Sequence, residues 1–238
     1  MIYFLTSSPC VVDSPALNPV NGFVDELKKA LPSPCRALFI ASDPDNRERT
    51  YRFYNDMSGS FAEIGIPFAQ ADVLIRENQD QCEELIANAQ LIILCGGHVP
   101  TQNAFFQELS LRERLQNWDG VVIGVSAGSM NSAEVVYVQP EEPGEAVDPH
   151  FQRFLPGLGL TRHMILPHYQ REKDGWLDGM RLYEDITYPD SVGHRFYTMV
   201  DGTYLLGRDG REELRGEAYL IQDGSIRQIS QEGETIAL

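Results

Sequence analysis

The chain contains the stretch Val121-Val122-Ile123-Gly124-Val125-Ser126-Ala127-Gly128-Ser129-Met130-Asn131, in which an apolar run ends in a Gly-x-Ser-x-Gly pentapeptide. The run predicts a buried strand, and the pentapeptide predicts a sharp strand-to-helix turn with Ser126 at its apex. Gly124 and Gly128 suit this turn because side chains there would collide with the tight backbone. The turn exposes the Ser126 hydroxyl beside the N–H groups of the next helix. We therefore expect a nucleophilic serine rather than an ordinary glycine-rich turn.

Short apolar runs alternate with helix-period segments through the first 135 residues, which is typical of βαβ units. The pattern predicts an α/β fold, a three-layer sandwich with a mostly parallel sheet and the serine elbow after a central strand. The expected strands are Ile2–Thr6, Arg36–Ala41, Phe68–Val73, Leu91–Cys95 and Val121–Val125. The expected helices are Phe23–Leu31, Arg49–Ile64, Gln79–Ala89 and Thr101–Trp118.

The second half of the chain has a different pattern. Residues 139–159 are rich in proline, glycine and acids, which predicts a surface excursion that can serve as a flap. The run Met164–Leu166 and a helix around Trp176–Glu184 follow. Asp-Gly pairs then separate short runs, so we expect hairpins and an antiparallel C-terminal end. The runs are Phe196–Val200, Tyr204–Leu206, Glu217–Ile221 and Ile226–Ile229, and the pairs are Asp201-Gly202, Asp209-Gly210 and Asp223-Gly224.

Composition narrows the partners of the chain. The 238 residues carry a net charge of −16, with 35 acidic and 19 basic residues, which argues against nucleic acid and anionic membranes. No apolar run is long enough to span a membrane, and the N-terminus reads as a first strand rather than a signal peptide. The cysteines have unrelated spacings, which indicates neither disulfides nor a zinc site: Cys10, Cys35, Cys82 and Cys95. We expect a single cytoplasmic domain with no cofactor and no metal ion.

A serine nucleophile needs a base and a group that orients the base. Among the five histidines, His168 is the preferred base because it follows an apolar run at the edge where a parallel sheet presents its crevice. Asp201 ends a later apolar run and is the preferred acid, although it could simply form a hairpin turn. The competing acids are Glu184, Asp185 and Asp190, and the other histidines are His98, His150, His163 and His194, of which His163 is expected to face solvent.

Gly96 and Gly97 end another expected strand without side chains. Their backbone N–H groups can therefore approach a ligand closely. With the N–H of Ala127 they would form a two-donor oxyanion hole.

Three segments together resemble the S51 serine peptidases, the dipeptidase E and cyanophycinase group. They are Leu94-Cys95-Gly96-Gly97-His98, Ile123-Gly124-Val125-Ser126-Ala127-Gly128 and Leu166-Pro167-His168-Tyr169. The resemblance extends over most of the chain and implies one class I glutamine amidotransferase-like domain over residues 1–238. It implies hydrolysis of small peptides through an acyl-enzyme. The roles that it implies are nucleophile for Ser126, base for His168, acid for Asp201 and oxyanion donors for Gly97 and Ala127.

Two departures from the family pattern concern substrate binding. The family's Gly-Gly-Gly-Asn-Thr is replaced by a loop that carries His98 after Gly96 and Gly97. Aspartate-specific members have Gly-Glu-Thr-Arg after the histidine, whereas residues 174–179 hold no arginine. We expect Gly96, His98, Arg171 and Arg181 to contact the substrate, with Lys173 as a further nearby cation. A preference for an N-terminal aspartate should be weak or absent unless one of these cations replaces the arginine.

Two other interpretations remain at this point. An α/β-hydrolase esterase shares the pentapeptide, but its order of serine, acid and histidine would require Asp185 or Asp190 and then His194, and it leaves the long antiparallel tail unexplained. A non-catalytic, amidotransferase-like binding protein would keep the elbow without using it. The expected partner is a small peptide, and a homodimer is left open.

Overall fold

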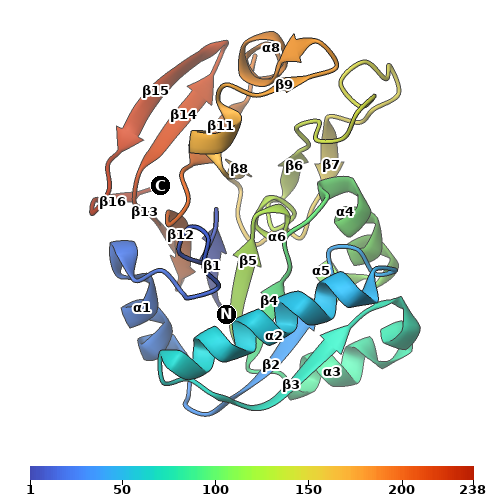
Figure 1. The fold of residues 1–238 in the computed structure, drawn as a ribbon, viewed down its shortest axis with the longest axis vertical. Coiled ribbons are helices and arrows are strands. Elements are labelled where there is room, and N and C mark those ends of the chain that lie inside the picture. The colour runs from blue at the N-terminus through green and yellow to red at the C-terminus, as the bar shows by residue number, and fades with distance from the viewer.

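The computed structural model describes residues 1–238 and has an eight-stranded sheet at its centre (Figure 1). The strand order is β16-β13-β12-β1-β5-β4-β2-β3. The five strands from the first half of the chain run parallel, and β5 lies between β1 and β4. These strands are β1 (Ile2–Thr6), β2 (Cys35–Ile40), β3 (Phe68–Leu74), β4 (Leu91–Leu94) and β5 (Val121–Val125). The predicted α/β class and the central position of the strand before Ser126 are confirmed.

Helices cover both faces of this sheet. Right-handed crossovers place α1 and α2 on one face and α3, α4 and α5 on the other, because the chain reverses its direction across the sheet after β3. Strands β4 and β5 are consequently buried along their whole length, as their continuous apolar sequence indicates. The helices are α1 (Phe23–Ala30), α2 (Arg47–Glu63), α3 (Cys82–Asn88), α4 (Val99–Glu108) and α5 (Leu111–Leu115).

The C-terminal strands divide between two sheets (Figure 1). Strands β12 (Tyr204–Arg208), β13 (Arg211–Arg215) and β16 (Thr235–Ala237) extend the main sheet in antiparallel fashion. A second sheet has the order β15-β14-β11-β8. Its strands are β8 (Met164–Leu166), β11 (Arg195–Met199), β14 (Ala218–Gln222) and β15 (Ser225–Ser230).

Two of the three predicted Asp-Gly hairpins are confirmed, namely those at Asp209-Gly210 and Asp223-Gly224. The third prediction is wrong. Asp201-Gly202 connects β11 in the second sheet with β12 in the main sheet, so the turn joins two sheets instead of closing a hairpin. This turn thereby carries Asp201 to the junction between the sheets.

Two predicted helices also differ from the structure. The segment 101–118 forms two helices, because Ser110 adopts a left-handed conformation with φ +48° between α4 and α5. The segment 176–184 forms the hairpin of β9 (Trp176–Leu177) and β10 (Met180–Arg181), followed by the π-helix η3 (Leu182–Thr187). Asp178 and Gly179 have positive φ and form the turn of that hairpin.

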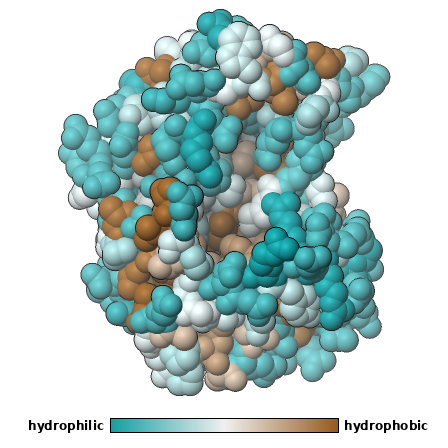
Figure 2. All heavy atoms as spheres, viewed as in Figure 1, coloured by the Kyte–Doolittle hydropathy of each residue, from teal (hydrophilic) through white to brown (hydrophobic).

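The excursion at 139–159 is anchored to the body of the protein. Its β7 (Phe154–Pro156) pairs with β6 (Val135–Tyr137), which precedes it. The remaining elements are short: η1 (Val20–Gly22), η2 (Arg76–Gln81), α6 (Ala127–Met130), α7 (Tyr169–Glu172) and α8 (Tyr188–Asp190). None of the helices is both long enough and apolar enough to cross a membrane. The face seen in Figure 2 is mostly hydrophilic, in keeping with the acidic composition.

Candidate active site

Ser126 lies at a strained turn between β5 and α6. Its φ of +52° and ψ of −111° are unusual for a residue with a side chain. A Cβ on Gly128 would lie 2.3 Å from the carbonyl oxygen of Leu94, and a Cβ on Gly124 would lie 2.9 Å from the backbone of Ser129. Neither position has room for a side chain, so both require glycine, as the sequence predicts.

His168 and Asp201 follow two neighbouring parallel strands. Leu166 at the end of β8 pairs with Thr198 in β11, so residues just beyond both strands meet at the same edge of the second sheet. His168 takes a left-handed conformation with φ +61°, which turns the chain into α7 directly after the strand. This turn places the imidazole between Asp201 and the Ser126 elbow.

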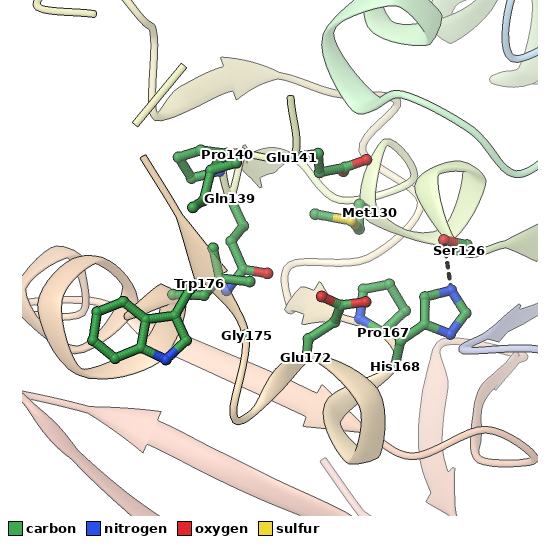
Figure 3. Close-up of a pocket in the computed structure, with 12 residues that line it drawn as sticks. Ser126, Met130, Gln139, Pro140, Glu141, Pro167, His168, Glu172, Gly175 and Trp176 are labelled. Atoms are coloured by element: carbon green, nitrogen blue, oxygen red, sulfur yellow. Dashed lines mark hydrogen bonds between the residues drawn. The ribbon is translucent and has the colours of Figure 1, made fainter. Parts of the chain in front are cut away.

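The three side chains form a continuous hydrogen-bonded relay. Nε2 of His168 lies 2.9 Å from Oγ of Ser126, and Nδ1 lies 2.6 Å from Oδ1 of Asp201. Figure 3 shows the His168 ring directed at the Ser126 hydroxyl. An ionised Asp201 accepts a hydrogen from Nδ1, which leaves Nε2 free to take the Ser126 proton.

Asp201 is held in the ionised form. Burial alone would raise the pKa of its carboxyl group, but hydrogen bonds from His168 and Ser7 and the nearby Arg171 outweigh burial and lower the pKa. The carboxylate therefore stays negative at neutral pH and can stabilise a protonated His168.

Ser7 is a fully buried residue that sequence reasoning missed. Its Oγ donates to Oδ1 of Asp201 and accepts the backbone N–H of His168, both at 2.8 Å. Thr6 pairs with Val125, so Ser7 stands beside Ser126 at the end of the neighbouring strand β1. No motif marks Ser7, because its role depends on strand pairing across more than a hundred residues.

The backbone of Gly96 and Gly97 flanks Ser126. A Cβ on Gly96 would lie 3.4 Å from the Ser126 Cβ, and one on Gly97 would lie 2.4 Å from Oγ of Ser42. Ser42 in turn donates to the carbonyl oxygen of Gly96 at 2.8 Å and fixes the loop. On the other side, the carbonyl oxygen of Ser126 accepts the backbone N–H groups of Ser129 and Met130. Ala127 is the first residue of α6, where a backbone N–H group has no partner within the helix. The predicted oxyanion donors thus lie close to the serine.

His98 ties the Gly96–Gly97 loop to the excursion. Its Nδ1 lies 2.8 Å from Oγ1 of Thr101, and its Nε2 lies 2.8 Å from Oε1 of Glu145. The other oxygen of Glu145 accepts the backbone N–H groups of Glu141 and Glu142. His98 therefore has a structural role in holding the flap, and its contact with the substrate stays a prediction.

One group of side chains has spacing suited to a metal ion. The donor atoms of His98, Glu142 and Glu145 lie within 4.8 Å of one another. Both oxygens of Glu145 and both ring nitrogens of His98 already have hydrogen-bond partners in the protein. Internal hydrogen bonds therefore account for this arrangement.

Two clefts open on either side of Ser126 and His168. The first cleft has a volume of about 310 Å³ and extends past Glu141, Glu172 and Trp176. Figure 3 shows this first cleft, with Glu141 and Glu172 on opposite walls. The second cleft has a volume of about 420 Å³ and is lined by Ser7, Ser8, Arg49, Gly96, Gly97 and His98, together with Glu141 and Glu142. Ser126, His168 and Glu141 border both clefts.

The predicted substrate cations are placed differently from expectation. Arg171 lies 3.5 Å from the outer oxygen of Asp201, and Arg181 forms an ion pair with Asp185 at 2.6 Å. Neither arginine lines a cleft, nor does Lys173. The predicted substrate contacts of Arg171 and Arg181 are therefore not supported, because acidic neighbours hold both guanidinium groups elsewhere.

Arg49 is the arginine that the structure does bring to the site. It lines the second cleft, and its Nη2 lies 3.5 Å from the position that a Cβ would take on Gly97. No carboxylate lies within 4.0 Å of its guanidinium group, in contrast to Arg47 and Arg52 on the same helix. Sequence reasoning missed Arg49 because it lies in the first turn of α2, far from every motif.

Two of the other histidines, His194 and His163, are engaged with residues other than Ser126. The ring of His194 packs against Phe154 with centroids 4.5 Å apart. Nε2 of His163 lies 3.1 Å from Glu212, so the expectation that His163 faces solvent is wrong. The structure therefore does not bring His194 to Ser126, as the esterase order of serine, acid and histidine would require.

Comparisons with known proteins show the family and the fold of the chain. The model of the family described as peptidase family S51 matches residues 3–212. No curated protein matches the chain significantly. A solved peptidase from an acI-B1 Actinobacterium is 18% identical, with a TM-score of 0.66 over 100% of this chain and 96% of that one. A protein from Listeria monocytogenes EGD-e, provisionally described as a peptidase E, is 14% identical, with a TM-score of 0.62 over 96% of this chain and 98% of that one.

Proposed function

Because the chain belongs to peptidase family S51 and is thus a serine-type peptidase, we propose that it hydrolyses small peptides with Ser126, His168 and Asp201 as its triad. The observation that carries the proposal is the relay from Ser126 Oγ through His168 to Asp201, with hydrogen bonds of 2.9 and 2.6 Å. Each member follows a strand end, where the rigid sheets fix its position.

The reaction proceeds in two halves. Ser126 Oγ attacks the peptide carbonyl carbon while Nε2 of His168 takes the hydroxyl proton, and Asp201 stabilises the imidazolium that forms. The N–H groups of Gly97 and Ala127 face the developing oxyanion. His168 returns the proton to the leaving amine, the C–N bond breaks and an acyl-enzyme remains. Water then attacks the acyl carbon while His168 takes one of its protons. The ester bond to Ser126 breaks, His168 returns that proton to Oγ, and the acid is released.

The small volumes of the two clefts favour a small substrate, and so does the position of Arg49. A guanidinium without an acidic partner, in a cleft that reaches the nucleophile, is suited to a free carboxylate such as the C-terminus of a dipeptide. The flap residues Glu141 and Glu142 border the same cleft and limit its extent. We therefore place dipeptides first among the substrates.

The test is hydrolysis of Ala-Leu, Ala-Leu-amide and an alanine pentapeptide, with a p-nitrophenyl ester as a reference substrate. We expect release of leucine from Ala-Leu, weaker turnover of the amide and of the pentapeptide, and no hydrolysis by the Ser126→Ala variant. Rapid ester cleavage without any peptide cleavage would favour the esterase. Absence of all turnover would favour the binding protein. The cytoplasmic location and the homodimer stay predictions.

A further inference from the structure

The first cleft carries two carboxyl groups without positive partners. Glu141 and Glu172 line it, and neither forms an ion pair within 4.0 Å with a lysine, arginine or histidine. No lysine or arginine lines this cleft, and His168 is its only basic side chain. In Figure 3 both carboxylates project into the space that leads to Ser126.

Acidic side chains surround Glu141. Glu141 is an exposed residue, yet the protein packed around its carboxyl group raises the pKa of that group to about 8, together with the negative charges of Glu145, Glu172 and Glu142. Arg49 opposes this rise only in part. A group with such a pKa is one that a positive ligand would drive into its charged form.

The far end of the first cleft offers an aromatic surface. Trp176 lines the cleft and is 67% exposed, an unusual exposure for a tryptophan. Its indole face can hold an ammonium or guanidinium group by a cation–π interaction. Met130 and Leu177 also line the cleft and can pack against an aliphatic stem.

The two clefts differ in charge. The first contains carboxyl groups and no lysine or arginine, whereas the second contains the guanidinium of Arg49 as well as Glu141 and Glu142. A short peptide has an ammonium group at one end and a carboxylate at the other. Complementary charges orient such a ligand, with its amino end in the first cleft and its carboxyl end in the second.

We propose that the first cleft, through Glu141, Glu172 and Trp176, binds a positively charged group on the residue that donates the acyl group. This inference rests on the proposed peptidase function and names its substrate class: peptides whose first residue carries a cation near the scissile bond. The cation is an ammonium or guanidinium group, supplied either by the free α-amino group or by a basic side chain. An N-terminal aspartate would bring another carboxylate into the cleft beside Glu172 and is disfavoured.

The test compares kcat/KM for Lys-Leu, Ala-Leu, Asp-Leu and the Nα-acetylated forms of the first two, using wild type and Glu172→Gln. Glu63→Gln serves as the matched control, because it makes the same charge change at the exposed C-terminal end of α2. In parallel, the rate at which an uncharged fluorophosphonate labels the protein reports on Ser126 independently of the cleft.

We expect wild type to cleave Lys-Leu at least about tenfold better than Asp-Leu, the effect of one well-placed charge pair. Glu172→Gln should reduce that ratio, and Glu63→Gln should not. Loss of activity on acetyl-Ala-Leu and acetyl-Lys-Leu alike identifies the α-ammonium as the bound group. Retained activity on acetyl-Lys-Leu alone identifies the side chain. Both results support the proposal.

Labelling at a normal rate with Asp-Leu cleaved as well as Lys-Leu, or with acetyl-Ala-Leu, whose first residue carries no cation, cleaved as well as Lys-Leu, would overturn the inference and leave the proposed function intact. A protein that is neither labelled nor active on any peptide would overturn both. These two failures are distinguishable because the fluorophosphonate needs only the serine and its base.

Discussion

Asp201 lies 2.6 Å from His168 because the two residues follow neighbouring parallel strands in nearly matching register. The pairing of Leu166 with Thr198 brings the chain beyond β8 alongside the chain beyond β11. The base and its acid are thereby fixed by one small sheet, whereas Ser126 is fixed by the main sheet. The relay thus exists only while the two sheets keep their relative position.

Replacement of the base tests the identity of the triad. His168→Ala should lower kcat by about 10⁴- to 10⁶-fold, and Asp201→Asn should lower it somewhat less. The matched control is His194→Ala, whose ring packs against Phe154 and should matter little to kcat. Steady-state kinetics on Ala-Leu decides the matter. A severe His194→Ala defect with a mild His168→Ala defect would instead support the esterase order.

Ser7 is predicted to be a positioning residue. Ser7→Ala removes a hydrogen bond to Asp201 and leaves the buried N–H of His168 without an acceptor, which should cost about 1–3 kcal/mol of stability. We expect kcat to fall about ten- to a hundredfold with little change in KM, since one hydrogen bond to a charged group is worth about 1.5–3 kcal/mol. Kinetics and thermal unfolding measure both effects.

Ser7→Thr keeps the hydroxyl group and should recover part of kcat. A purely structural role would lower Tm without moving kcat at temperatures well below unfolding. That result would remove Ser7 from the account of the relay.

Arg49 is predicted to bind the carboxylate of the leaving group. Arg49→Ala should raise KM for Ala-Leu about tenfold and leave KM for Ala-Leu-amide nearly unchanged. Arg52→Ala is the control, because it removes the same charge from an exposed site on α2 where the arginine pairs with Glu48. Equal effects of Arg49→Ala on both substrates would show that this side chain does not contact the C-terminal carboxylate.

The raised pKa of Glu141 predicts a pH-dependent stability difference. The folded protein holds this proton up to a pH of about 8, whereas an ordinary glutamate loses it near pH 4.5. Stability is therefore lost as pH rises from about 4.5 to 8, because the folded state binds more protons than the unfolded state over that range. Glu145, Glu172, Glu142 and Arg49 are the charged groups that act on Glu141.

The variant Glu141→Gln cannot ionise and should escape this loss. Urea unfolding at pH 5, 7 and 9 should give nearly equal free energies of unfolding at pH 5 and a growing advantage for the variant at higher pH. The advantage should be modest, because the side chain keeps some contact with solvent. Parallel curves for the two proteins would contradict the assigned pKa.

Features set by local sequence could be predicted from the chain alone. The strand Val121–Val125 and the glycines at 124 and 128 depend on a continuous apolar run and on a tight turn, and both are visible in a short window. His168 and Asp201 were found because each follows an apolar run. The βαβ alternation of the first half likewise identified the parallel sheet.

Features that depend on tertiary pairing could not be predicted in this way. The Asp201-Gly202 pair looks like a hairpin turn, but its two flanking strands pair with partners in different sheets. Ser7 and Arg49 reach the site only through folding of β1 and α2 beside the elbow. The segment 176–184 contains the turn residues Asp178 and Gly179, which indicate a hairpin. Its apolar residues favour a helix instead, and this stronger pattern hides the turn.

Covalent labelling of the nucleophile tests the central claim most directly. A fluorophosphonate should attach to the folded protein with one-to-one stoichiometry, and mass spectrometry of its peptides should place the adduct on Ser126. Ser126→Ala should abolish labelling and leave the fold unchanged, whereas Ser225→Ala, at an exposed hairpin serine, should label like wild type. Full labelling of Ser126→Ala, or an adduct on any other residue of wild type, would contradict the account.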